Sequence, residues 1–236
     1  MARQRTNANL SSGEVTGGTI FFVIYLLVLP FATDPLFRLA ELLLDVNISA
    51  GMQSAIYYYV LFAVTAMIFH GLLGRSTRTL ADNAALAAKT LGMGLVALYG
   101  LNELVYRLTH ALINNQTNLN DVSISARIDT APLSTLLIVL FLAPFVEEFL
   151  FRGLVFGGLR SRSRTVAYLV SCVLFAFLHV WQYAWGNQDA AYFWLMLQYL
   201  VPGAVLAWAY DHSGTLWTSV ALHGLANALS VLVSRL

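Results

Sequence analysis

The chain has 236 residues, of which 58% are hydrophobic and only 11% are charged, and its mean hydropathy is +0.70. Because a soluble domain of this length carries about 25% charged residues, the composition excludes an ordinary soluble protein and indicates an integral membrane protein. A net charge of +1 argues against a nucleic-acid partner, and the single cysteine, Cys172, excludes a disulfide within the chain.

The apolar stretches predict seven transmembrane helices, because a bilayer core of ~30 Å needs about 20 residues of helix. Since helices satisfy their own backbone hydrogen bonds in lipid, we expect an all-α, polytopic transmembrane helical bundle. The two longest connections, residues 34–52 and 114–131, have room for short interfacial helices. The predicted membrane helices cover residues 18–33, 53–73, 90–113, 132–159, 165–185, 191–210 and 214–234.

Three parts of the chain follow from this division. Residues 1–17 are polar and rich in Gly and Ser, so we expect a flexible cytoplasmic N-terminus. Residues 18–131 hold the first three membrane helices and their loops. Residues 132–234 hold the last four, which carry the sequence motifs described below.

Lys and Arg are distributed unevenly between the two ends of the predicted bundle. Eight lie on the side of the N-terminus and three on the opposite side, while Arg107 and Arg152 fall inside predicted membrane helices. The positive-inside rule therefore places the N-terminus in the cytoplasm and the C-terminus outside. The eight are Arg3, Arg5, Arg75, Arg78, Lys89, Arg160, Arg162 and Arg164, and the three are Arg38, Arg127 and Arg235.

An ionisable cluster lies in the middle of the fourth predicted membrane helix, at Glu147, Glu148 and Arg152. A single carboxylate at the centre of a bilayer costs roughly 2.5–3.5 kcal/mol, so an intramembrane cluster suggests a functional site. Glu148 and Arg152 are four residues apart and can pair on one helix face. Glu147 points about 100° away and needs water, a proton or a partner from another helix. It is therefore a candidate general base, the alternative being a charge cluster that locks helix packing.

Two further membrane helices contain polar side chains at a similar depth. His179 lies in the fifth, and His223 and Asn227 share one face of the seventh. Taken separately, His179 could be a packing residue, and His223 and Asn227 could form hydrogen bonds between helices. With the N-terminus inside, however, Glu147, His179 and His223 all lie roughly 15–21 Å from the cytoplasmic face. A carboxylate, two imidazoles and an amide could activate a water and stabilise an oxyanion, or could bind a metal.

The third predicted membrane helix holds a second pair of opposite charges, Glu103 and Arg107, again four residues apart. No charge is left over in this pair. We therefore expect a self-neutralised ion pair that helps to hold the bundle together.

The motifs Glu147-Glu148-x-x-x-Arg152, Phe175-x-x-x-His179 and His223-x-x-x-Asn227 resemble the signature of the CPBP intramembrane proteases. This is the CAAX-prenyl-endopeptidase and bacteriocin-processing group, also called the Abi family. Each motif is weak alone, but together they occur in order on successive membrane helices. The resemblance covers residues 132–234.

The resemblance implies a membrane-embedded endopeptidase that cleaves a peptide bond near the cytoplasmic leaflet. By analogy, Glu147 and His179 activate the attacking water, and His223 and Asn227 stabilise the oxyanion. The family has been described as metal-dependent and also as using a glutamate without a metal. If zinc binds, its ligands would be Glu147, His179 and His223. However, the sequence contains no zinc-binding helix motif such as HExxH. We therefore expect no tightly bound metal.

The remaining matched residues are given supporting roles by the resemblance. Glu148 and Arg152 support the site and position the substrate, and Phe175 lines the cavity beside His179. The implied partners are a peptide or protein substrate, which could be lipidated, and the lipid bilayer of a prokaryotic plasma membrane. The alternatives are a catalytically silent scaffold or bacteriocin-immunity factor of the same fold, and a proton-coupled transporter, although no internal repeat is evident.

Overall fold

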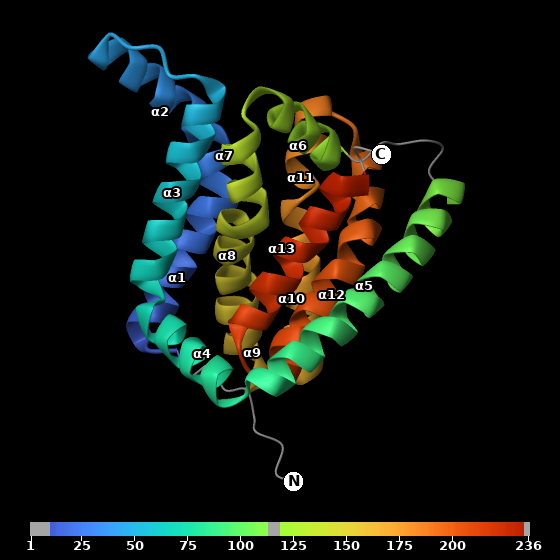
Figure 1. The fold of residues 1–236 in the computed structure, drawn as a ribbon. Coiled ribbons are helices and arrows are strands. Elements are labelled where there is room, and N and C mark those ends of the chain that lie inside the picture. The colour runs from blue at the N-terminus through green and yellow to red at the C-terminus, as the bar shows by residue number, and fades with distance from the viewer. Residues whose placement is uncertain (1–9, 113–118, 234–236) are drawn as a thin grey trace.

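The computed structural model describes residues 10–112 and 119–233, and all regular secondary structure in these ranges is helical (Figure 1). Within these ranges, seven helical stretches are long and apolar enough to cross a membrane. The prediction of an all-α bundle, and of a multi-pass membrane protein, is thereby confirmed. The stretches are Ser12–Leu44, Ala50–Ile68, Ala84–Val105, Pro132–Arg160, Arg164–Asn187, Ala190–Ser213 and Leu216–Val233.

The first helix begins earlier than predicted, because α1 (Ser12–Val23) starts with a capping box. The Ser11 hydroxyl accepts a hydrogen bond from the Glu14 N–H, and the Glu14 carboxylate accepts one from the Ser11 N–H. This carboxylate is buried and also pairs with Arg75 at 3.2 Å. The prediction of a flexible segment over residues 1–17 is therefore wrong for the part that α1 covers. Its first nine residues lie outside the described part of the chain.

The first helix also continues further than predicted. A π-helical segment, η1 (Ile24–Val28), joins α1 to α2 (Leu29–Leu44), so residues 34–44 are helical although we expected a connection there. At 1.5 Å per residue the 33-residue stretch is about 50 Å long, which exceeds a ~30 Å bilayer core. Its last turns therefore project beyond the rest of the bundle, as Figure 1 shows.

The next four helices complete the first half of the bundle. α3 (Ala50–Ile68) packs along α1, and α4 (His70–Asp82) lies at the end of the bundle where α1 begins. α5 (Ala84–Leu112) crosses back and contacts the C-terminal helices. α6 (Leu119–Thr130) lies at the opposite end, where a short helix was expected between the third and fourth spans.

The predicted ion pair of the third span forms, but it does not hold the bundle together. Arg107 Nε donates to Glu103 Oε1 at 2.6 Å, and the two side chains are 76% and 53% exposed. Both residues belong to α5, so the pair joins no two helices. Helix α5 continues to Leu112, so Arg107 lies within its last two turns.

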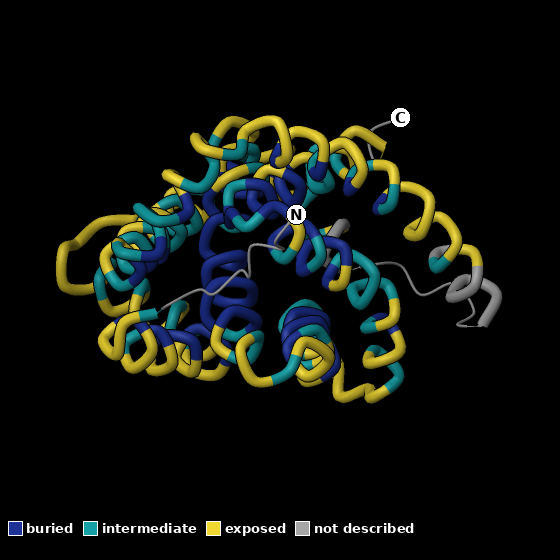
Figure 2. Tube along the Cα trace, turned by 90° about the horizontal axis from the view of Figure 1, so that it is seen from below, coloured by how far each residue is buried: buried dark blue, intermediate teal, exposed yellow. Residues whose placement is uncertain are grey.

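The fourth stretch forms the centre of the bundle. Among its most apolar 18 consecutive residues 61% are buried, compared with at most 39% in any other stretch. Figure 2 shows the buried segments gathered in the middle of the molecule and the exposed ones around them. Five segments follow one another in this stretch: α7 (Pro132–Leu137), η2 (Ile138–Leu142), α8 (Ala143–Glu148), η3 (Phe149–Phe156) and α9 (Gly157–Arg160).

The last three stretches surround this central helix. They consist of α10 (Arg164–Leu178) with α11 (Trp181–Asn187), the 3₁₀ segment η4 (Ala190–Leu195) with α12 (Met196–Ser213), and α13 (Leu216–Val233). α10 and α12 pack against each other and α10 packs against η3, while α13 packs against η2 and α8. The three predicted motifs thus lie on helices that are neighbours in space.

Candidate active site

The glutamate pair lies on α8, between the π-helical segments η2 and η3. In η2 the N–H of Ala143 donates to the carbonyl of Ile138, five residues back. Pro144 lacks an N–H, so it cannot donate the equivalent hydrogen bond to the carbonyl of Val139. Asn227 Nδ2 donates to that carbonyl instead, at 2.8 Å. Short π-helical turns are frequent at functional sites, and here one supplies the acceptor that fixes α13.

Glu148 forms the ion pair that the sequence predicts. Arg152 Nη1 donates to Glu148 Oε1 at 2.9 Å, and both side chains are fully buried. Arg152 Nη2 donates to the carbonyl of Gly203 at 3.0 Å, which ties the central helix to α12. The same Glu148 oxygen also accepts from His223 Nδ1 at 2.9 Å, an interaction that the sequence did not predict. Glu148 therefore both neutralises Arg152 and orients His223.

Glu147 has a different environment from Glu148. The residue is only 7% exposed, and its Oε2 atom has no hydrogen-bond partner among the described residues. Oε2 lies 3.6 Å from His179 Nε2 and 3.9 Å from His223 Nε2. These distances are too long for direct hydrogen bonds, but a water molecule can bridge such gaps. The predicted difference between the two glutamates is therefore present in the structure.

The two imidazoles are held in the same tautomer. His179 Nδ1 lies 2.8 Å from the carbonyl oxygen of Phe175, which can only accept, so Nδ1 carries the proton. His223 Nδ1 likewise faces the carboxylate of Glu148. When the rings are neutral, both Nε2 atoms therefore present a lone pair to Glu147. His179 is further fixed by stacking on Tyr199, with the ring centroids 4.5 Å apart.

Gly224 lets α13 approach the central helix closely. A Cβ atom at this position would overlap the carbonyl oxygen of Leu140. We expect Gly224→Ala to destabilise the protein by at least the ~1–3 kcal/mol typical of overpacking, because backbone rather than a flexible side chain must move. The measurement is thermal unfolding of the full chain in detergent.

The matched control is Gly92→Ala, since a Cβ at Gly92 of α5 meets nothing within 4 Å. A glycine inside an exposed helix is less favourable than alanine by about 1 kcal/mol, so this control should be neutral or stabilising. Equal melting temperatures for the two variants would refute the close approach of α13 to Leu140.

A cavity of about 550 Å³ reaches Glu147, His179, His223 and Asn227. Its wall also includes Tyr25 of η1 and Tyr57 and Tyr58 of α3, which come from the part of the chain without motifs. Three adjacent tyrosines, 57–59, interrupt an otherwise apolar membrane helix, and this was the sequence signal that could have indicated them. Tyr25 gave no such signal.

Phe175 is not placed as predicted. It does not belong to the cavity wall but is buried behind it, only 2% exposed. Its ring lies 4.3 Å from the guanidinium carbon of Arg152 and 4.5 Å from the ring centroid of His179. The reason is that Arg152, fully buried on η3, takes the ring of Phe175 as a cation–π partner. Phe175 therefore supports the two functional residues from behind instead of facing the cavity.

Comparison with known proteins concerns the same four helices. Residues 129–229 match the family model described as Type II CAAX prenyl endopeptidase Rce1-like. The UPF0177 protein YxdF of Lactococcus lactis subsp. lactis (strain IL1403) is 30% identical over 86 residues, which is 36% of this chain and 42% of that protein. The chain thus aligns with less than half of this relative, and no solved structure matches it. The match confirms the resemblance to the CPBP proteases over the last four membrane helices, which are similar to the Rce1-like CAAX prenyl endopeptidase family.

Proposed function

We propose that this protein is an intramembrane endopeptidase that hydrolyses a peptide bond of a membrane-associated peptide or protein. The observation that carries the proposal is the carboxylate of Glu147, which lies on the cavity wall opposite two imidazole nitrogens. Its Oε2 atom is buried and makes no hydrogen bond within the described residues. The family match to CAAX-type endopeptidases supports the same class of reaction.

The proposed attack uses a water held between Glu147 and His179. Their facing atoms are 3.6 Å apart, and both accept hydrogen bonds when Glu147 is ionised and His179 is neutral. A water that donates its two hydrogens to them directs its oxygen lone pairs toward the cavity. Glu147 then takes a proton as the water attacks the peptide carbonyl, and later returns it to the leaving amine.

The proposed oxyanion site consists of His223 and Asn227. Because His223 Nδ1 faces Glu148, Nε2 can donate to an oxyanion only when the ring carries a second proton. Asn227 uses one amide hydrogen on the Val139 carbonyl, which leaves the other hydrogen of the same group for the oxyanion. Arg152 and Phe175 do not line the cavity, and their proposed role is to position Glu148 and His179.

The experiment is an assay of the full chain in detergent against a panel of membrane peptides, with and without a prenylated C-terminal cysteine motif. We expect one or more peptides to be cleaved by the wild type and not by His179→Ala, with the products identified by mass spectrometry. Cleavage at equal rates by both proteins would remove the proposed role of the site.

A metal ion has a suitable set of donor groups here but not a suitable geometry. Two imidazoles and a carboxylate are ligands that zinc accepts. Within the described residues, however, no group of three or more His, Cys, Asp or Glu side chains lies close enough together to hold a metal. We derive no step through a metal. We expect cleavage to survive treatment with a chelator, and a loss that added zinc restores would contradict this.

A further inference from the structure

The cavity lies entirely on one side of Glu147. On the central helix its wall consists of residues between 135 and 147, all before Glu148 in the chain. On the neighbouring helices it includes Leu178, His179, Gln182 and Tyr183, whereas the first half of α10 contributes none. The opposite half of the central helix is filled by Phe149, Phe151 and Phe156, which are fully buried. Glu147 is therefore the floor of the cavity and not a point along a channel.

The two ends of the bundle can be told apart by their contacts. One end, here called the basic end, contains the start of α1, α4 and the turn between α9 and α10. It is held together by Glu14–Arg75 at 3.2 Å and by Arg160–Asp211 at 2.7 Å. The other end, the cavity end, contains α2, the start of α3 and α6, all of which contribute to the cavity wall.

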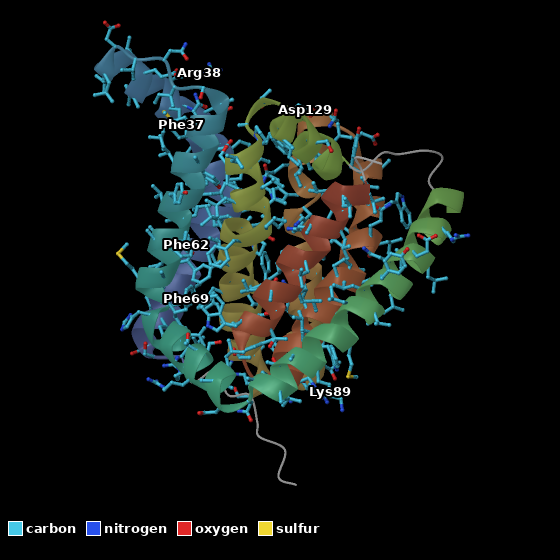
Figure 3. The ribbon with its side chains drawn as sticks, in the orientation of Figure 1. Phe37, Arg38, Phe62, Phe69, Lys89 and Asp129 are labelled. Carbon is cyan, nitrogen blue, oxygen red and sulfur yellow. The ribbon has the colours of Figure 1, made fainter. Side chains whose placement is uncertain are left out.

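Basic residues are concentrated at the end that the cavity does not reach. Figure 3 shows Lys89 at the basic end, and Arg38 and Asp129 at the other. Among the described residues, the basic end has twice as many Lys and Arg as the cavity end. The basic end contains Arg75, Arg78, Lys89, Arg160, Arg162 and Arg164, and the cavity end contains Arg38, Arg107 and Arg127.

We propose that the catalytic cavity opens on the extracytoplasmic side of the membrane. The positive-inside rule counts Lys and Arg in short segments next to the membrane, and it places the basic end in the cytoplasm. This proposal rests on the proposed function. Its consequence is that the substrate is a peptide segment outside the cell, at or near the outer leaflet. The proposal replaces the expectation of cleavage near the cytoplasmic leaflet. Glu147 lies about midway along its helix, so its depth alone does not show which face of the membrane the site opens to.

The test is thiol labelling in intact cells that express the full chain, which has one native cysteine, the buried Cys172. On a Cys172→Ala background, Ser54→Cys places a thiol in the cavity wall and Ser161→Cys places one in the basic turn. We expect a membrane-impermeant maleimide to label Ser54→Cys in intact cells. Ser161→Cys should be labelled only after permeabilisation.

The reverse pattern, with Ser54→Cys labelled only after permeabilisation, would overturn the proposal. Thr130→Cys is a second probe at the cavity end, to be used if Ser54→Cys does not reach the membrane. The labelling requires no cleavage, so a catalytically inactive protein would refute the proposed function and leave this result unchanged.

Discussion

Replacing Glu147 with glutamine should reduce peptide cleavage by about 10²–10⁴-fold, which is the usual contribution of a positioned general base. The amide cannot accept the proton of the attacking water. The fold should remain intact, because Glu147 Oε2 makes no hydrogen bond to another described residue and lies 3.6 Å or more from the two imidazoles. The measurement is the initial rate on the best-cleaved peptide of the panel, with the melting temperature recorded in parallel.

The matched control for this variant is Glu103→Gln. Glu103 is also a carboxylate on a membrane helix, but it is exposed and does not line the cavity. Its substitution should leave the cleavage rate unchanged. If Glu147→Gln also retained the wild-type rate, the silent scaffold of the same fold would become the better explanation.

Replacing Arg152 with methionine should have the largest effect on stability, about 3–5 kcal/mol. Removing one partner of a buried ion pair leaves the other charge uncompensated in a low-dielectric interior. Here the remaining carboxylate of Glu148 is fully buried, and Gly203 and Phe175 lose the guanidinium as well. Chemical or thermal unfolding in detergent gives the change in the free energy of unfolding.

Two further variants separate charge from packing. The double variant Glu148→Gln/Arg152→Met should be more stable than Arg152→Met alone, because no buried charge is left without a partner. Arg107→Met removes an arginine from an exposed i,i+4 pair and should cost no more than about 1 kcal/mol. A wild-type melting temperature for Arg152→Met would contradict the structural role of this pair.

The sequence predicted those features that depend on local spacing or on apolar length. The seven membrane stretches follow from hydropathy, and the Glu148–Arg152 pair follows from a spacing of four residues on one helix. The approach of Glu147 to His179 and His223 agrees with the similar depth of the three residues. Each of these inferences needed only the geometry of single helices and the depth of each residue measured from the cytoplasmic face of the membrane.

Features that depend on packing between helices could not be predicted in this way. Glu14 was treated as part of a loose tail, although Ser11-x-x-Glu14 is a capping-box pattern, and its partner Arg75 is far along the chain. Phe175 was expected on the cavity wall because of the resemblance to the CPBP proteases, but the buried guanidinium of Arg152 lies against its ring. The tyrosines of the cavity wall come from helices without any motif, so only the three-dimensional arrangement brings them to Glu147.

The most direct test of Glu147 as the base of a peptide hydrolysis is cleavage in ¹⁸O-labelled water. The best-cleaved peptide is incubated with the purified full chain, and both products are analysed by mass spectrometry. We predict that the wild type places ¹⁸O in the new terminal carboxylate and that Glu147→Gln forms almost no product at the same protein concentration. Labelled product from Glu147→Gln at the wild-type rate would contradict the role of Glu147.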